Sequence, residues 1–333
     1  VIENGEVSRQ PGYITEFWTD RAIHFLETAK SRQDTDSQPF YLHLTYNGPY
    51  SLDPDLLTDP ERSRNRHTER YANLPMDSFP RESPHPGLFK HTKELNNIDA
   101  MRASAAQISG VDDGVGEVLA ALERLGLAGN TLVVFTSDQG TTGGHHGIWG
   151  MGHNTKPSVA YDTVVQVPLI IRHPDQIPAA KTSDLLVNNY DMMPFVLDYV
   201  GLTEEIPENS PGRSFANAVR GEPIEWDNVT YYEHFYTRAI RTDRWKYVWR
   251  LDQPDDLFDL ENDPGELQNL AEDPSNDEIV VRLKTQLDAF FDHYADPRYD
   301  IVRGGESKTW RPPFVEPDFV PVTDKTRYYE YNE

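Results

Sequence analysis

Asp138 and Gln139 are the residues of this sequence best suited to bind a metal ion. They follow Thr131–Thr136, a β-branched and apolar run typical of a strand, and they precede Gly140. A carboxylate and an amide carbonyl at the C-terminal end of a strand suit a hard cation on an open α/β sheet. The alternative is a strand-end turn in which Asp138 caps the backbone.

A loop rich in Gly and His follows at residues 143–154. It is longer than a simple connection requires, which favours a functional loop. Its polar and glycine-rich composition predicts that it lies outside the core. Lys156 comes next, and Val167–Ile171 is a second apolar strand.

Two long strings of this sequence resemble the type I sulfatases, relatives of the alkaline phosphatases. The first runs from the strand through SDQG, GxHGxWG and YD to VPLII, in the order of that family's C-terminal metal-site motif. The second, LFDLENDPGELQNLAED at Leu257–Asp273, is similar to the family's LYDLxxDPxExxNLA. The resemblance covers nearly all of this chain but only the C-terminal two-thirds of a sulfatase.

The resemblance implies an α/β fold with a mixed, mostly parallel sheet flanked by helices, as in alkaline phosphatase. A small C-terminal subdomain of antiparallel sheet plus helix would follow. We therefore expect residues 1–220 to form the C-terminal portion of the α/β domain and residues 221–295 to form the subdomain. Residues 296–333 would be an extended tail.

The same resemblance implies the metal and the catalytic groups. Ca²⁺ would be held by Asp138 and Gln139, which supply only part of its six to eight oxygen ligands. His146 matches the histidine of the GxHG loop and could orient a sulfate group or protonate the leaving oxygen. Lys156 could contact sulfate in place of the lysine that close relatives carry at the position of Met151. The alternatives are a loop-packing histidine and a surface lysine.

Four further residues are candidates for substrate binding. Tyr50 stands where the family has a sulfate-binding histidine, so that contact is altered here. His153 and Asn154 could contact substrate from the loop. His234 ends a predicted strand of the C-terminal subdomain, where packing is the alternative role.

The nucleophile of the family does not occur in these residues. Sulfatases use formylglycine, made from Cys or Ser in a C/S-x-P-x-R motif near the N-terminus. The 333 residues contain neither Cys nor Ser-x-Pro-x-Arg. We expect a missing N-terminal segment, in the same protein or in trans, to supply the nucleophile, and we expect this chain alone to be inactive on sulfate esters.

Composition limits the partners. The formal net charge of −24 argues against nucleic acid, because phosphate repels an acidic surface. Any bound anion must instead be held locally, by a metal or by a few basic side chains. No apolar run approaches the ~20 residues of a membrane-spanning helix, and no signal peptide is visible. A periplasmic or extracellular location is implied by the family alone.

The remaining elements follow from periodicity. The helix at 278–294 should turn Val281, Leu283, Leu287 and Phe290 inward. The segment at 53–95 should be a long surface excursion, with irregular packing as the alternative. The other helices are expected at 21–29, 93–125 and 191–201, and the other strands at 39–45, 185–189, 229–234, 237–241, 245–249 and 256–259.

Three functions remain open. The first is part of a calcium-dependent sulfatase that cleaves carbohydrate or aryl sulfates. The second is a phosphate or phosphonate monoester hydrolase, which Gln139 disfavours because an amide is a poor zinc ligand. The third is a non-catalytic sulfate- or glycan-binding relative, which the absent nucleophile favours.

Overall fold

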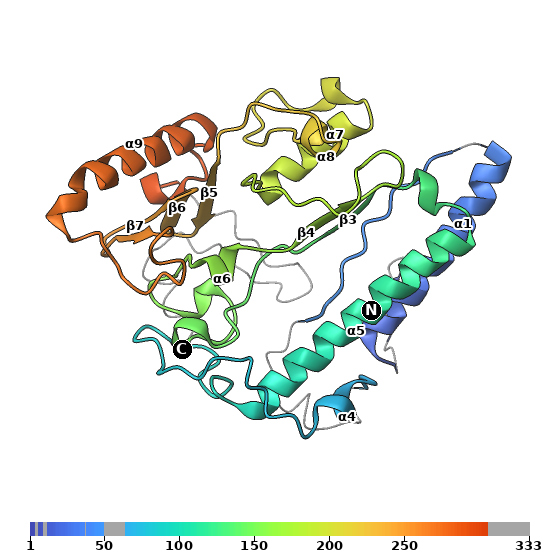
Figure 1. Ribbon diagram of the computed structural model, residues 1–333, viewed down its shortest axis with the longest axis horizontal. Helices are drawn as coiled ribbons and strands as arrows, with labels where there is room; N and C mark the ends of the chain where they lie inside the picture. Colours follow the sequence, from blue (N-terminus) through green and yellow to red (C-terminus); the bar gives the residue numbers. More distant parts are fainter. Residues whose placement is uncertain (4–5, 9–11, 37, 50–63, 306–333) are drawn as a thin grey trace. The chain divides into compact units, whose positions relative to one another are not determined.

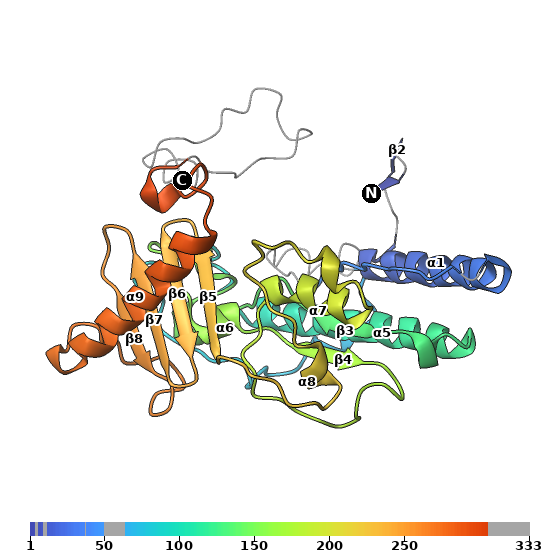
Figure 2. The same ribbon diagram turned by 90° about the horizontal axis from the view of Figure 1, so that it is seen from above.

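A computed structural model describes residues 1–3, 6–8, 12–36, 38–49 and 64–305, which form two compact units (Figures 1 and 2). The first unit comprises Val1–Lys156, Asp162–Lys181 and Val219–Gly221. The second unit comprises Pro157–Tyr161, Thr182–Ala218 and the described residues from Glu222 onward. The predicted division at residue 220 stays a prediction, although Thr182–Ala218 groups with the C-terminal sheet.

Two long helices form the body of the first unit. α1 (Ile14–Asp36) lies along α5 (Ile98–Arg124) in both views (Figures 1 and 2). Close approach depends on small residues, since a Cβ at Gly114 would lie 2.5 Å from the Thr19 hydroxyl. α5 starts at Ile98 because the Asn97 side chain accepts hydrogen bonds from the first backbone N–H groups.

The strand that precedes Asp138 is confirmed. β3 (Val133–Thr136) pairs antiparallel with β4 (Leu169–Arg172), with Val133 opposite Arg172. The smaller elements of this unit are β1 (Ile2–Glu3), β2 (Glu6–Val7), α4 (Thr68–Tyr71), α6 (Asp162–Val165) and the 3-10 turns Ala128–Asn130, His145–Gly147 and Gly152–Asn154.

Two predicted strands are wrong. Residues 39–45 form no strand, and Phe40 and Leu42 instead pack against the buried Leu26. Residues 185–189 also form no strand, because side chains take the place of a ladder: Leu186 N–H donates to Asn228 Oδ1 at 3.0 Å. Apolar and aromatic side chains do not make a strand when no neighbouring backbone supplies the hydrogen-bond ladder.

The predicted surface excursion at 53–95 is partly core. Met76 and Leu95 are buried against α5 residues Ala100 and Met101. The first part of the predicted segment, residues 53–63, lies outside the described residues. The irregular-packing alternative holds for the described part.

A four-stranded antiparallel sheet and one helix form the core of the second unit. Each strand pairs with the next in the chain, and α9 covers one face (Figure 1). Ile240, Tyr247 and Leu257 of the sheet are buried against Leu283 and Leu287 of the helix. The elements are β5 (Val229–His234), β6 (Thr237–Thr242), β7 (Trp245–Arg250), β8 (Asp256–Asp259) and α9 (Asp277–Tyr294).

One helix position was predicted wrongly. Val281 is 63% exposed, whereas Leu283 and Leu287 are buried and Phe290 stacks on Tyr231. Two helical residues step about 200° around the axis, so Val281 and Leu283 cannot both face the sheet. The other elements of this unit are α7 (Met192–Tyr199), α8 (Ala216–Val219), which ends in the first unit, and the 3-10 turns Asn189–Asp191, Thr203–Glu205, Pro274–Asn276 and Ile301–Arg303.

The mixed α/β class and the C-terminal antiparallel sheet with its helix are confirmed. Every strand pair within the described residues is antiparallel, so the expected parallel strands are not among them. Each helix in the described part of the chain is too short or too polar to span a lipid bilayer. Residues 306–333, most of the predicted tail, lie outside the described residues.

Candidate functional site

Asp138 and Gln139 are both exposed, directly after the C-terminal end of β3. The Ser137 hydroxyl donates a hydrogen bond of 2.9 Å to the Gln139 carbonyl oxygen. The next residue, Gly140, donates its N–H to the Val164 carbonyl at 2.8 Å. The turn after the pair is thus anchored to α6, while the two side chains stay accessible to solvent.

The donor chemistry of this pair fits a hard cation. A carboxylate and an amide oxygen are ligands that Ca²⁺ accepts, and their adjacency on an anchored turn lets both reach one ion. Three or more His, Cys, Asp or Glu side chains do not cluster in a metal-binding arrangement anywhere in the described ranges. Asp138 and Gln139 would therefore supply part of a coordination shell that other ligands complete.

The loop after this pair is closed by one buried threonine. Thr142 donates its N–H to the Gly150 carbonyl at 2.9 Å, and its hydroxyl lies 2.6 Å from the Ile148 carbonyl oxygen. Ile148 is fully buried, and Trp149 is buried and stacks on Phe79 with ring centres 6.0 Å apart. The prediction that this loop lies outside the core is therefore wrong for its middle, where two apolar side chains anchor it.

His146 sits in a tightly constrained part of the loop. Its backbone is left-handed, with φ of 57°, and its side chain is half-buried. Gly147 follows with φ of +64°, and a Cβ there would lie 1.9 Å from the Ser83 carbonyl oxygen. His85 donates its backbone N–H to the Gly147 carbonyl at 2.9 Å. The segment at 83–85 therefore fixes the backbone from which the His146 imidazole projects.

Asn154 is fully buried. Its amide donates to the Trp149 carbonyl at 2.9 Å, and its backbone carbonyl accepts from Phe89 N–H at 3.1 Å. A Cβ at Gly150 would lie 2.3 Å from the Asn154 amide nitrogen, so position 150 favours glycine. These contacts favour a structural role for Asn154 over the predicted contact with substrate.

Basic side chains gather around Phe89. The Lys156 ammonium lies 4.5 Å from the centre of the Phe89 ring, and the Lys90 ammonium lies 5.5 Å from it. Burial, and then the charges of Lys90 and His91, lower the pKa of His153. Burial, and then the charge of Lys156, lower the pKa of Lys90. The four basic residues are therefore close enough to influence one another electrostatically.

A short backbone ladder holds this cluster in place. Lys156 donates its N–H to the Gly87 carbonyl at 2.9 Å, and Leu88 and Thr155 form an isolated antiparallel bridge. A Cβ at Gly87 would lie 2.4 Å from the Lys156 carbonyl oxygen, so only glycine permits this approach. The sequence analysis missed Lys90 and His91, because no motif marks them. The signal that could have found them is the LFKH string, two basic residues beside an aromatic, in a lysine-poor chain.

Two predicted substrate residues are placed differently. Tyr50 lies outside the described residues. His234 belongs to the second unit, at the end of β5, where its ring meets the Phe235 ring edge-on with centres 4.3 Å apart. His146, His153, Asn154 and Lys156 therefore lie together in the first unit. The structure does not place Tyr50 or His234 with them.

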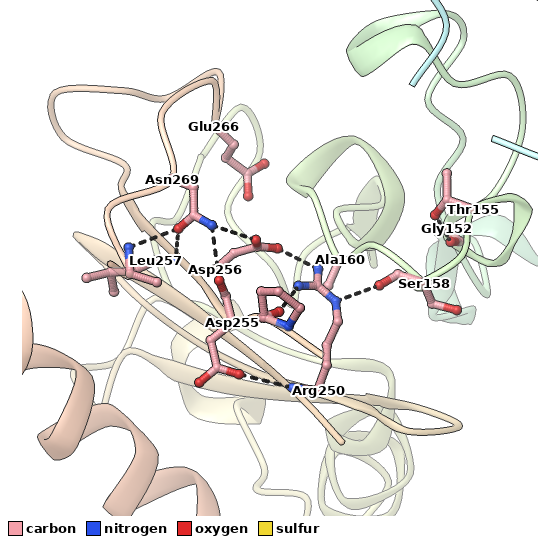
Figure 3. A network of polar contacts seen from close by, with 12 residues as sticks. Gly152, Thr155, Ser158, Ala160, Arg250, Asp255, Asp256, Leu257, Glu266 and Asn269 are labelled. Atoms are coloured by element: carbon pink, nitrogen blue, oxygen red, sulfur yellow. Dashed lines mark hydrogen bonds and ion pairs between the residues drawn. The ribbon is translucent and has the colours of Figure 1, made fainter. Parts of the chain in front are cut away.

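The chain that leaves the loop enters a polar network in the second unit. Arg250 donates to the Ser158 carbonyl at 3.0 Å and pairs with Asp256 (Figure 3). The buried Lys246 ammonium donates to the Ala160 carbonyl at 3.0 Å and pairs with Glu266 at 2.6 Å. Two buried cations thus satisfy the carbonyls of an irregular segment and are themselves neutralised by carboxylates.

Two family models match this sequence. The model described as Sulfatase matches residues 3–202, and the model described as N-sulphoglucosamine sulphohydrolase, C-terminal, matches residues 152–293. Together they cover most of the described residues. These matches confirm the resemblance to the sulfatases that the two sequence motifs indicated.

Individual relatives agree with the family models. An endo-4-O-sulfatase of Bacteroides thetaiotaomicron is 28% identical and aligns with 84% of this chain and 56% of that protein. A choline-sulfatase of Rhizobium meliloti is 28% identical, over 92% of this chain and 60% of that protein. A solved structure from Bacteroides fragilis, described as a candidate sulfatase, yidJ, superposes with a TM-score of 0.69 at 28% identity, covering 85% of this chain and 59% of that one. This chain spans less than two-thirds of the length of these relatives.

Proposed function

We propose a sulfate-ester function from one premise: the chain belongs to the type I sulfatases, a family of the alkaline phosphatase superfamily. In this proposal the chain forms part of a sulfuric ester hydrolase. Its substrates would be sulfate esters of carbohydrates or aryl alcohols. The sulfated-carbohydrate class is supported by the name of another relative, an N-acetylglucosamine-6-O-sulfatase that is 32% identical over 51% of this chain.

The placement of Asp138 and Gln139 carries the proposal. Both side chains are exposed on an anchored turn at the end of β3, where the family's motif has its metal ligands. We propose that they hold Ca²⁺ together with ligands from outside this set. When bound, the ion would neutralise negative charge on the sulfuryl oxygens.

The loop residues would act on the ester itself. His146 would donate a proton to the leaving oxygen. Its constrained left-handed backbone would hold the imidazole in one position. The Lys156 ammonium would bind a sulfuryl oxygen, and His153 would line the same region. Tyr50 and His234 remain proposed substrate contacts from other parts of the chain.

The nucleophile would be formylglycine from a segment outside residues 1–333, because these residues contain neither Cys nor Ser-x-Pro-x-Arg. That residue would supply the nucleophilic oxygen that attacks the sulfur atom. A periplasmic or extracellular location accompanies this proposal on family grounds.

A non-catalytic sulfate- or glycan-binding role is the second candidate. The absence of a nucleophile motif from these 333 residues is the observation that favours it. The two candidates differ in one measurable respect, since both bind sulfated ligands but only the first releases sulfate. A phosphate or phosphonate hydrolase is less well supported, because the Gln139 amide is a poor ligand for zinc.

The test combines this chain with a sulfatase N-terminal segment that carries formylglycine. We expect release of para-nitrophenol from its sulfate ester only in the reconstituted protein with Ca²⁺, and only slow release from the phosphate ester. Asp138→Asn should reduce turnover at least about 100-fold. Asp112→Asn, which changes an exposed carboxylate on α5, is the matched control and should leave turnover unchanged.

Two outcomes would contradict the proposal. Preference for the phosphate ester would indicate a phosphomonoesterase. Binding of a sulfated ligand without any turnover, in a reconstituted protein whose formylglycine is verified by mass spectrometry, would indicate the non-catalytic role.

A further inference from the structure

We propose that Lys90 and His91 form an anion-binding subsite for a second acidic group of the substrate, beside His153 and the Lys156 ammonium that would bind the sulfuryl oxygen of the scissile ester. The chemistry recognised is a sulfate or carboxylate on a sugar next to the one that carries the scissile ester. This identity of the substrate rests on the proposed function, whereas the capacity to bind an anion does not.

The arrangement of the two ammonium groups is the first observation. They lie 4.5 Å and 5.5 Å from the centre of the Phe89 ring, which serves as a common apolar platform. An aromatic face attracts a cation without neutralising it. Lys90 makes no ion pair with any carboxylate in the ranges that the structure describes.

The second observation is that like charges are held together. The charge of Lys156 disfavours a charge on Lys90, and the charges of Lys90 and His91 disfavour a charge on His153. The Glu94 carboxylate lies 3.8 Å from His91 Nδ1. In a chain of net charge −24, a group of four basic residues is a local exception. A bound anion would relieve the repulsion and gain from several cations at once.

The third observation is that the two segments are rigidly joined. Lys156 N–H bonds the Gly87 carbonyl, Phe89 N–H bonds the Asn154 carbonyl, and Leu88 bridges Thr155. The backbones that carry the four basic residues are therefore in place before a ligand arrives. A preorganised group loses less conformational entropy on binding than side chains on mobile loops.

Isothermal titration of the full chain tests the subsite directly. The probes are inorganic sulfate, a disaccharide with one sulfate and one carboxylate, and the same disaccharide without either group. We expect Lys90→Gln to weaken binding of both anionic probes by about 5- to 20-fold. Lys93→Gln removes the same charge from an exposed lysine on the same segment and should change binding less than about twofold. The neutral disaccharide should not bind.

Lys90→Arg keeps the charge and should restore most of the affinity, which separates the loss of charge from any misfolding of the Gln variant. Equal affinity of the wild type, Lys90→Gln and Lys93→Gln would overturn the proposal, as would a wild-type chain that binds no anion. Weaker binding of the disaccharide alone would show that the subsite takes the carboxylate, whereas weaker binding of both anionic probes would show that it takes sulfate. None of these measurements needs the nucleophile, so a failure of sulfatase turnover is distinguishable from a failure of the subsite.

Discussion

The Lys156 ammonium lies 4.5 Å from the centre of the Phe89 ring. The two residues belong to separate loops that a short backbone ladder joins, through Lys156 N–H and the Gly87 carbonyl. Of the two, only Lys156 was a candidate from the sequence, as a replacement for the family lysine lost at Met151. Its surroundings are formed by Phe89 and Lys90, which belong to a segment that no motif marks.

Phe89→Leu should weaken sulfate binding about 2- to 5-fold, because a leucine removes the aromatic face beside both ammonium groups while keeping an apolar side chain. Isothermal titration with inorganic sulfate measures the change. Phe25→Leu, on α1, serves as the control and should leave sulfate affinity unaltered. An unchanged affinity in Phe89→Leu would show that the ring does not orient the cations.

Gly147→Ala should destabilise the protein by about 2–4 kcal/mol. Its φ of +64° disfavours a side chain, and a Cβ would lie 1.9 Å from the Ser83 carbonyl oxygen. Urea denaturation measures the free energy of unfolding. Gly116→Ala is the matched control: a Cβ at that position would have no neighbour within 4 Å, and a helical alanine should stabilise α5 by about 0.5–1 kcal/mol. An unchanged free energy of unfolding in Gly147→Ala would mean that the loop backbone does not lie this close to segment 83–85.

Glu266→Gln should cost about 3–5 kcal/mol of stability, because it leaves the buried Lys246 ammonium without its carboxylate. The unfolding transition of the second unit, followed by tryptophan fluorescence, should shift accordingly. Asp34→Asn breaks the exposed pair with Lys30 and should cost less than about 1 kcal/mol. Similar effects of the two variants would contradict the buried character of the Lys246 pair.

Sulfate affinity should rise as the pH falls below 6.5, the ordinary pKa of a histidine. Burial, Lys90 and His91 hold the pKa of His153 below its ordinary value of 6.5, so its ring is neutral at pH 7 and becomes a cation only in more acidic solution. Bound sulfate favours that cation. Titrations at several pH values should show the rise in the wild type and a smaller rise in His153→Gln.

The lowered pKa of His153 also makes the stability of the protein depend on pH. The unfolded chain binds a proton at His153 more readily than the folded one, so stability is lost as the pH falls through 6.5 toward the lower pKa. His153→Gln should remove that part of the loss, whereas His24→Gln, exposed on α1, should not. Identical pH profiles of sulfate affinity and stability for His153→Gln and the wild type would contradict the assigned shift.

Local patterns predicted much of this structure. The strand before Asp138, the helices at α5 and α9 and the four strands of the C-terminal sheet appear close to their expected positions. Each has a periodic pattern or a capping residue within its own segment, and the sheet strands pair with neighbours in the chain. Such elements are encoded over short distances.

Other features could not be predicted from local patterns. Residues 39–45 have the composition of a strand but no ladder, and Ile148 and Trp149 are buried inside a loop whose composition is polar. In both cases the outcome depends on what lies beside the segment. Burial and strand pairing are set by partners that are distant in the sequence.

The sequence by itself determined that a carboxylate and an amide end a strand and that His146, His153 and Lys156 follow them in close succession. The tertiary structure alone decided that Asn154 is buried inside the loop and that Lys90 and His91 join His153 and Lys156 around Phe89. The physical reason is that residue type and spacing act along the chain, whereas the electrostatic field at a site is the sum over all charges that the fold brings within reach.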